Sequence, residues 1–351
     1  YKKIKHQGNI DSELQFLTEQ FIISKSYKLV SRYWHILSIK NYESLIAHGI
    51  KRYGTTIATN YFTFLNLRDE WVDKAHANIK SIDNLNLNAQ IFKKQNNLNY
   101  QESIIYNYLC LLLYYNLKRT NSFEYLKRLK DVAYLGFDDP SIKIDEFNIT
   151  TDKLSSLFDY DQINKAFNFQ KIKTILEIGA GSGRTSEAIM SINDNLNYVV
   201  CDIIPSIYIS YKRLKTVFPN KKISLLVGIE NKEELEKNIK SNDVSFIFPH
   251  QLEILSNNLF DLVIAIDCIH EMDKDTIQYY FRLINKLTPN FYTSIWKQTK
   301  LPYSKTFFSK TNRLDYDKGD YNIPSHWENN FKENLVFPSN YLSLGFKTKN
   351  I

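Results

Sequence analysis

Three glycines, Gly179, Gly181 and Gly183, alternate with other residues directly after the apolar run 174–178. A buried strand that ends in a glycine-rich turn lets a ligand approach the backbone closely, because glycine has no side chain in the way. The residues that follow, 184–192, have the composition of a helix. The stretch therefore predicts the strand, turn and helix that open a nucleotide-binding α/β sheet.

The spacing of these glycines separates two classes of nucleotide. A dinucleotide-binding fingerprint, G-x-G-x-x-G, needs a third glycine where this chain has Arg184, and it has no place for the acid Glu177. The order E-x-G-x-G-x-G instead resembles motif I of the class I S-adenosylmethionine-dependent methyltransferases. The resemblance implies S-adenosylmethionine as the cofactor, with the glycines bordering its methionine part and the acid anchoring its amino end. The implied contacts here are Glu177, Gly179, Ala180, Gly181 and Gly183. A turn without a ligand and a nicotinamide dehydrogenase are the alternatives.

A second apolar run, 198–201, ends in an acid, Asp202, which lies 19 residues beyond Gly183. An acid at about this distance from the glycines can accept hydrogen bonds from both ribose hydroxyls of a nucleotide. Asp202 is therefore the predicted ribose ligand. It could also cap a helix that begins near Pro205, and the two roles are compatible.

Two further apolar runs, 244–248 and 260–266, complete the pattern of strands alternating with helical stretches. This alternation predicts parallel strands with right-handed crossovers, and ligands then bind beyond the carboxyl ends of the strands. In the methyltransferase pattern, the residues after the third strand line the adenine pocket, with a plain loop as the alternative. The residues at these two strand ends are Pro249, His250 and Gln251 after the third strand, and Asp267 after the fourth.

The stretch after Asp267 reads C-I-H-E-M-D over 268–273. Methyl transfer to a hydroxyl requires removal of the hydroxyl proton, and a neutral histidine is suited to this near pH 7. His270 is therefore the predicted base, and Glu271 or Asp273 could orient its imidazole or hold a metal. A histidine that caps a helix or packs under the loop is the alternative. The spacing of the acids is not diagnostic of a metal, so we assign none.

The composition excludes some classes of protein. The 351 residues carry a net charge of +7 without a dense arginine stripe, so we expect no nucleic-acid partner, although a phosphorylated or acidic sugar substrate would fit. No apolar stretch has the length of a membrane helix, and no signal peptide is recognisable. The three widely spaced cysteines fit buried thiols in a cytoplasmic protein. The oligomeric state is open.

The chain divides into four predicted parts. Residues 1–135 lack the strand–glycine–helix pattern and are read as a helical accessory domain, and 136–170 as a connector with a short helix. Residues 171–295 are the predicted core, and 296–351 are an aromatic-rich tail that completes the core and the acceptor site. The predicted fold class is α/β, with a Rossmann-like methyltransferase core, a mostly parallel sheet and a helical N-terminal domain.

The tail contains N-R at 312–313, Y-N-I-P at 321–324 and Trp327. Together with the helical preface, the glycine loop and the His-Glu-Met sequence after the fourth strand, this arrangement resembles the putative sugar O-methyltransferases of bacterial surface-polysaccharide clusters. The resemblance implies a sugar hydroxyl as the methyl acceptor, in polysaccharide or nucleotide-sugar biosynthesis. The alternatives are a methyltransferase acting on another small molecule, a protein or RNA, and a catalytically silent cofactor-binding subunit.

Sugars are bound by aromatic faces and by planar polar groups that read hydroxyls. The tail supplies both types of side chain, and the guanidinium of Arg313 could also bind a phosphate or carboxylate with two hydrogen bonds. The alternative is that the aromatic side chains pack the tail against the core. The predicted acceptor contacts are Trp296, Arg313, Tyr321 and Trp327.

Overall fold

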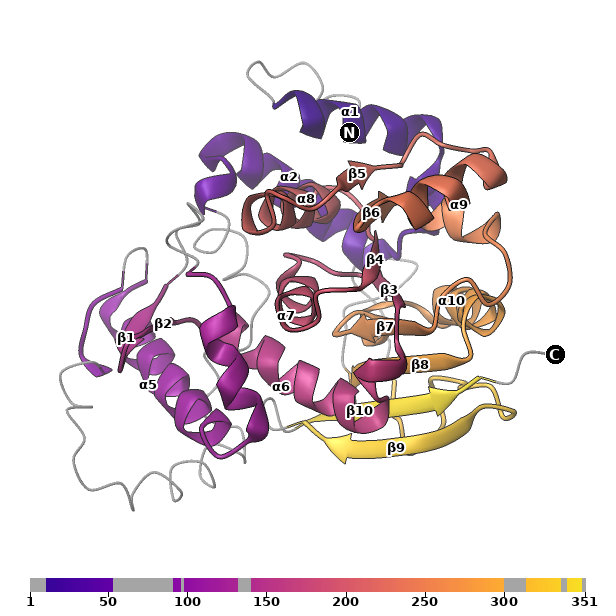
Figure 1. The fold of residues 1–351 in the computed structure, drawn as a ribbon. Coiled ribbons are helices and arrows are strands. Elements are labelled where there is room, and N and C mark those ends of the chain that lie inside the picture. Colours follow the sequence, from indigo (N-terminus) through magenta and orange to yellow (C-terminus); the bar gives the residue numbers. More distant parts are fainter. Residues whose placement is uncertain are drawn as a thin grey trace, which may run out of the picture.

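The computed structural model describes residues 11–52, 91–95, 98–131, 140–299, 314–335 and 340–348. Its centre is an eight-stranded sheet with the strand order β5-β6-β4-β3-β7-β8-β10-β9 (Figure 1). The strands are β3 (Thr174–Ile178), β4 (Asn197–Cys201), β5 (Ile223–Leu225), β6 (Val244–Ile247), β7 (Leu262–Ile266), β8 (Asn290–Trp296), β9 (Glu328–Asn334) and β10 (Tyr341–Lys347). A separate hairpin joins β1 (Ile142–Ile144) to β2 (Phe147–Ile149).

The strands from β5 to β8 are all parallel, and only the far edge of the sheet is antiparallel, where β10 lies between β8 and β9. All five residues of β7 are buried, as expected for a strand covered on both faces. From the central β3 the chain builds outward to β4 and its neighbours, and then returns to place β7 on the other side. The predicted mostly parallel, Rossmann-like sheet is confirmed, and the strand order reverses between β3 and β7.

The helices that alternate with the strands form a layer on each face of the sheet. They are α7 (Arg184–Ile192), α8 (Ser206–Val217), α9 (Lys232–Ser241) and α10 (Lys274–Leu287). Alternate residues of each strand point to opposite faces, and they divide the core in two. Ile175 of β3 packs in the cluster that contains α7 and α8, and Leu176 in the cluster that contains α9 and α10.

The predicted helices at the N-terminal end of the chain are also confirmed. They are α1 (Ser12–Ile23), α2 (Arg32–His48) and α5 (Tyr100–Leu117), and α6 (Thr151–Ala166) follows within the predicted connector. Short 3₁₀ helices connect the longer elements, at Ser26–Leu29, Ile50–Arg52, Asn121–Arg128, Phe169–Lys171, Pro249–Glu253 and Ile269–Glu271. The buried residues of α1 and α5 belong to the same apolar cluster as Ile175, so these helices share a core with the sheet.

Helix α6 is longer than the short helix predicted for the connector, with 16 residues. Thr150 caps its first turn by accepting a hydrogen bond from the Lys153 amide, and its apolar side chains are buried against α5 and α7. Because buried apolar residues occur all around the helix, the sequence lacks the one-sided apolar pattern of a surface helix. No helix in the part of the chain that the structure describes is long and apolar enough to span a membrane.

A buried ion pair joins α7, the helix that follows the glycine loop, to α8. The Nε of Arg213 donates to Oε2 of Glu187 at 2.6 Å, and both side chains are 4% exposed. Removing one partner of a buried pair leaves the other charge in an apolar environment without compensation.

We expect Glu187→Gln to lower the free energy of unfolding by about 3–5 kcal/mol, because the Arg213 guanidinium loses its opposite charge. Urea denaturation followed by circular dichroism measures the change. The control is Glu124→Gln, which removes the exposed pair with Lys127 and should cost about 0–1 kcal/mol. Equal losses in the two variants would contradict the role given to the buried pair.

Candidate functional site

The glycine loop after β3 has the backbone that its sequence predicts. Gly179 and Gly181 have φ angles of +74° and +59°, a region that residues with a side chain rarely adopt. A Cβ atom on Gly179 would lie 2.7 Å from the Cβ of Cys268, so the loop passes directly over the end of β7. A Cβ atom on Gly181 would meet nothing within 4 Å. The loop is thus packed on one side and open on the other.

A cavity of about 220 Å³ lies on the open side of the loop. It occupies the crevice beyond the carboxyl ends of the strands, next to the point where the strand order reverses, which is the usual ligand position in this type of sheet. Its walls combine the glycine loop, the ends of β4 and β7, and residues of α2 and α6. The predicted site residues that line it are Glu177, Gly179, Ala180, Gly181, Asp202, Pro249, Asp267 and Glu271.

Asp202 joins the glycine loop to the end of β4. Its Oδ2 accepts a hydrogen bond from the Gly181 amide at 2.7 Å, and its Oδ1 accepts one from the Ile203 amide at 2.7 Å. Burial raises the pKa of the Asp202 carboxyl to about 7, although both amides act in the opposite direction. Each carboxylate oxygen has a second lone pair, so Asp202 can still accept hydrogen bonds from a ligand in the cavity.

Glu177 lies near the end of β3, under the glycine loop. Its Oε2 accepts a hydrogen bond from the hydroxyl of Tyr198 at 2.8 Å, and burial raises the pKa of its carboxyl to about 7. Desolvation disfavours the ionised carboxylate, so a cation bound beside Glu177 would restore its charge.

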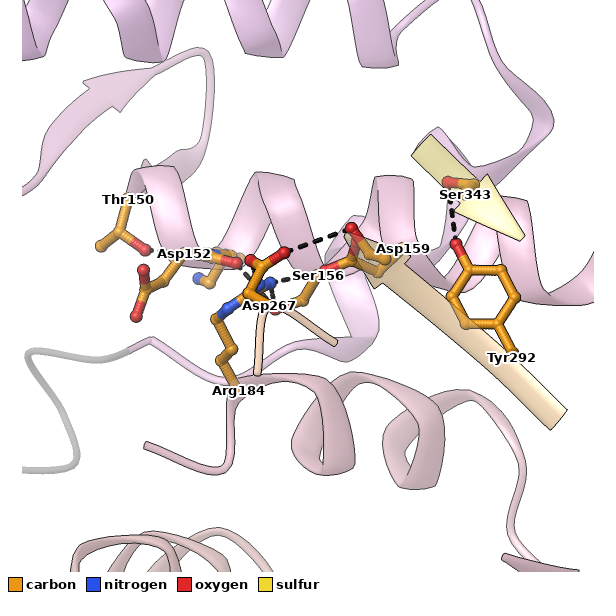
Figure 2. A network of polar contacts seen from close by, with 10 residues as sticks. Thr150, Asp152, Ser156, Asp159, Arg184, Asp267, Tyr292 and Ser343 are labelled. Carbon is orange, nitrogen blue, oxygen red and sulfur yellow. Dashed lines mark hydrogen bonds and ion pairs between the residues drawn. The ribbon is translucent and has the colours of Figure 1, made fainter. Parts of the chain in front are cut away.

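Arg184, the first residue of α7, connects two acids from different parts of the chain. Figure 2 shows its guanidinium beside Asp159 of α6 and Asp267, which follows β7. The distances are 2.7 Å to Oδ2 of Asp159 and 3.3 Å to Oδ2 of Asp267. Asp267 also accepts a hydrogen bond from Ser294 at 3.2 Å. The side chains of Asp159 and Arg184 are 2% and 12% exposed, whereas that of Asp267 is 37% exposed and faces the cavity.

The cavity is strongly acidic. Among the lining residues that the structure describes, Arg184 is the only cationic side chain. The acidic side chains of the lining are Asp152, Asp159, Glu177, Asp202, Asp267 and Glu271. Such a wall favours a cationic ligand and repels a pyrophosphate. The local charge is thus opposite to the net charge of the chain.

The structure corrects the prediction for His250 and Gln251, which do not line the cavity. The amide group of Gln251 is fully buried, donating to the carbonyls of Leu226 and Ile229 and accepting from the Phe248 amide. His250 lies between Ser26, at 2.5 Å from Nδ1, and Glu230, at 2.9 Å from Nε2. Both side chains fasten the loop after β6 to neighbouring segments. Gly183, likewise, is the N-cap of α7 and packs against α8 rather than the cavity.

His270 is placed differently from its neighbour Glu271. Its imidazole is 2% exposed, stacks on the Trp296 ring at 5.4 Å and meets the edge of the Tyr341 ring at 5.3 Å. Burial lowers the pKa of His270 to about 3, and within the described residues its Nδ1 has no hydrogen-bond partner. His270 is absent from the described lining of the cavity, whereas Glu271 is part of it. This geometry does not support a direct role for His270 as the base.

The predicted acceptor residues of the tail pack against the core. Trp327 is surrounded by Phe281, Phe291 and Phe346, and its Nε1 donates to Asn285 at 2.9 Å. The hydroxyl of Tyr321 donates to the Trp296 carbonyl at 2.7 Å. The rings of Trp296, Tyr321 and Trp327 are thus used for packing, since a sequence does not distinguish an aromatic ring that binds a ligand from one that fills a core. Arg313 lies outside the described residues.

Sequence reasoning missed several residues of the cavity wall. Ser31 and Trp34 come from α2 and its N-cap, and Asp159 comes from α6. No motif marks these residues, because they reach the cavity only through long-range packing. In the sequence, Arg184 is conspicuous only because it stands where a dinucleotide fingerprint would have its third glycine. The described residues hold no group of three or more His, Cys, Asp or Glu side chains that could bind a metal ion.

Several solved structures resemble the chain in part. The mitomycin 7-O-methyltransferase MmcR is 10% identical, with a TM-score of 0.38 over 81% of this chain and 70% of that one. The pyocyanin biosynthetic protein PhzM is 13% identical, with a TM-score of 0.37 over 66% of this chain and 62% of that one, so the chain spans less than two thirds of PhzM. An S-adenosylmethionine-dependent methyltransferase from Clostridium acetobutylicum is 11% identical, with a TM-score of 0.36 over 55% of this chain and 89% of that one. At these values the likeness assigns neither ligand nor activity.

No protein-family model matches the chain, and a comparison with curated proteins found no relative.

We expect Gly179→Ala to destabilise the protein more than Gly181→Ala. Both variants place a side chain at positive φ, at a cost of about 1–2 kcal/mol. Only the new methyl group at position 179 collides with Cys268, which adds about 1–3 kcal/mol. Urea unfolding of the two variants tests the close packing of the loop on the end of β7. Equal midpoints would show that the loop is not seated there.

Proposed function

We propose that the protein is an S-adenosylmethionine-dependent methyltransferase that methylates a sugar hydroxyl. The observation that carries the proposal is an acidic cavity lined by the glycine loop and Asp202, beyond the carboxyl ends of the central strands. S-adenosylmethionine carries a sulfonium and an ammonium group against one carboxylate, so its net charge suits this wall. The ribose hydroxyls would donate to Asp202, and the glycine loop would leave room for the methionine part beside Glu177.

The charge of the cavity also bears on the dinucleotide alternative. A nicotinamide cofactor brings a pyrophosphate, which a site of this fold binds with amide donors and without facing carboxylates. Here the Gly181 amide already donates its hydrogen bond to Asp202, and the acids Glu177 and Asp267 line the same cavity. Bringing two phosphates among these acids would be electrostatically unfavourable. The charges of the cavity therefore favour a cationic cofactor over a dinucleotide.

The acceptor end of the cavity supplies aromatic faces from unexpected elements. Trp34 of α2 and Tyr341 of β10 line it, together with the apolar Leu335. Aromatic rings bind the C–H faces of a sugar, and neighbouring polar groups read its hydroxyls. The acidic wall favours a neutral sugar in the cavity. The phosphates of a nucleotide-linked sugar would then lie outside the cavity.

Methyl transfer is tested by incubating the purified protein with methyl-labelled S-adenosylmethionine and a panel of acceptors. The panel contains neutral sugars, a nucleotide sugar, an acidic polysaccharide, a protein and tRNA. We expect label in a sugar fraction and S-adenosylhomocysteine as the second product. Label in protein or tRNA alone would replace the sugar assignment. Tight binding of the donor without transfer to any acceptor would favour a catalytically silent subunit.

We expect donor binding to weaken as the pH falls, because the ribose hydroxyls need the ionised form of Asp202. The raised pKa of about 7 means that this carboxyl is mostly protonated below pH 7. The dissociation constant of S-adenosylhomocysteine should therefore be about tenfold larger at pH 6 than at pH 8. Calorimetric titration at both pH values measures the difference.

The matched variants are Asp202→Asn and Asp261→Asn. Asp261 also accepts two backbone hydrogen bonds, from Lys173 and Thr174. It precedes β7, however, and so lies at the amino ends of the strands, opposite the cavity. Asp202→Asn should weaken binding at pH 8 by about 1–3 kcal/mol and reduce the pH dependence to the part that Glu177 contributes, while Asp261→Asn should leave both unchanged. An unaltered dissociation constant in folded Asp202→Asn would refute the ribose contact.

A further inference from the structure

Helix α2 and its N-cap form hydrogen bonds with the loop that follows β7, although the two segments are more than 230 residues apart in the sequence. The indole Nε1 of Trp34 donates a hydrogen bond to Oε2 of Glu271 at 3.0 Å. The hydroxyl of Ser31, the N-cap of α2, donates to the backbone carbonyl of Glu271 at 3.3 Å. One residue of the loop is thus held at both its side chain and its backbone by the N-terminal part of the chain.

These three residues line the cavity that contains the glycine loop and Asp202. Glu271 therefore lies on the cavity wall, while the imidazole of His270 is enclosed by the Trp296 and Tyr341 rings. His270 and Glu271 are adjacent in the sequence and are predicted to act together, but they have different surroundings in the structure. Of the two, only Glu271 is among the described residues that line the cavity.

The groups around Glu271 determine when its carboxyl is charged. Asp267, Cys268, Tyr33 and Tyr341 are its titratable neighbours from the loop, α2 and β10. Burial, and then the charge of Asp267, raise the pKa of Glu271 to about 8, and the Trp34 N–H acts in the opposite direction. A carboxylate with a raised pKa is a stronger base than an exposed one, and an approaching sulfonium favours its ionised form.

We infer that Glu271, positioned by Trp34, removes the proton from the acceptor hydroxyl in the proposed methyltransferase reaction. The acceptor oxygen forms a bond to the methyl carbon as the carbon–sulfur bond breaks. The sulfur keeps that electron pair and leaves as the neutral thioether of S-adenosylhomocysteine, and the hydroxyl proton passes to the Glu271 carboxylate. The inference rests on the proposed function, and it gives the helical N-terminal region a place in the active site.

The first test compares Glu271→Gln with His270→Phe, using the full chain. Loss of a general base costs about 10²–10⁴-fold in rate, so Glu271→Gln should lose at least 100-fold in kcat. Its affinity for S-adenosylhomocysteine should stay within a few fold of wild type. His270→Phe keeps an aromatic ring between Trp296 and Tyr341, and its kcat should fall less than tenfold. The reverse order of the two losses would overturn the inference.

The second test uses the pH dependence of kcat. Activity should rise with pH as Glu271 loses its proton, with a midpoint no higher than about 8, because the bound sulfonium favours the carboxylate. A base with the lowered pKa of His270 would give a flat profile above pH 5. Trp34→Phe keeps a ring but removes the N–H that favours the carboxylate, so the midpoint should move to higher pH. A purely structural role of Trp34 would lower kcat equally at every pH.

Trp327→Phe is the matched control, because it removes an indole N–H from a core hydrogen bond with Asn285 and should leave the midpoint unchanged. A wild-type protein that neither binds S-adenosylhomocysteine nor transfers methyl groups refutes the proposed function as a whole. A wild-type protein that transfers methyl groups, with full activity retained in Glu271→Gln, refutes only the assignment of the base.

Discussion

One guanidinium balances the acidic wall on which the site is built. Arg184 follows the glycine loop directly, so the turn that opens the cavity also aims this side chain at Asp159 and Asp267. Without the guanidinium, the carboxyls of Asp159 and Asp267 would lie near each other in a partly buried environment. Two ionised carboxylates are unfavourable there, so at least one would have to be protonated. The network therefore holds α6 against the segment that follows β7 (Figure 2).

The part of the cavity that the glycine loop forms could be predicted from the sequence because its geometry is local. Strand ends are recognisable from apolar runs, and positive φ angles restrict the loop to glycine. Gly179, Gly181, Asp202 and Asp267 accordingly line one cavity. The mostly parallel sheet was predictable for the same reason. His250 was misplaced because a polar residue after a strand can equally fasten two loops together.

The part of the cavity formed by α2, α6 and the loop after β7 depends on contacts between distant segments, which no local sequence pattern predicts. Trp34 meets Glu271 across more than 230 residues, and α6 contributes Asp159 although its sequence lacks a one-sided apolar pattern. The aromatic tail was conspicuous in the sequence, yet Trp327 fills the core. The type of ring alone does not distinguish an aromatic side chain that packs in the core from one that binds a ligand. Helix α2 reaches the cavity because its buried residues belong to the same apolar core as one face of the sheet.

We propose that the acidic cavity binds S-adenosylmethionine through the glycine loop and Asp202. A crystal structure with S-adenosylhomocysteine tests it most directly. We predict that both ribose hydroxyls lie within hydrogen-bond distance of the Asp202 carboxylate, and that the open side of the sulfur faces Glu271. A ligand bound outside this cavity, or one whose ribose lies away from Asp202, would contradict the account.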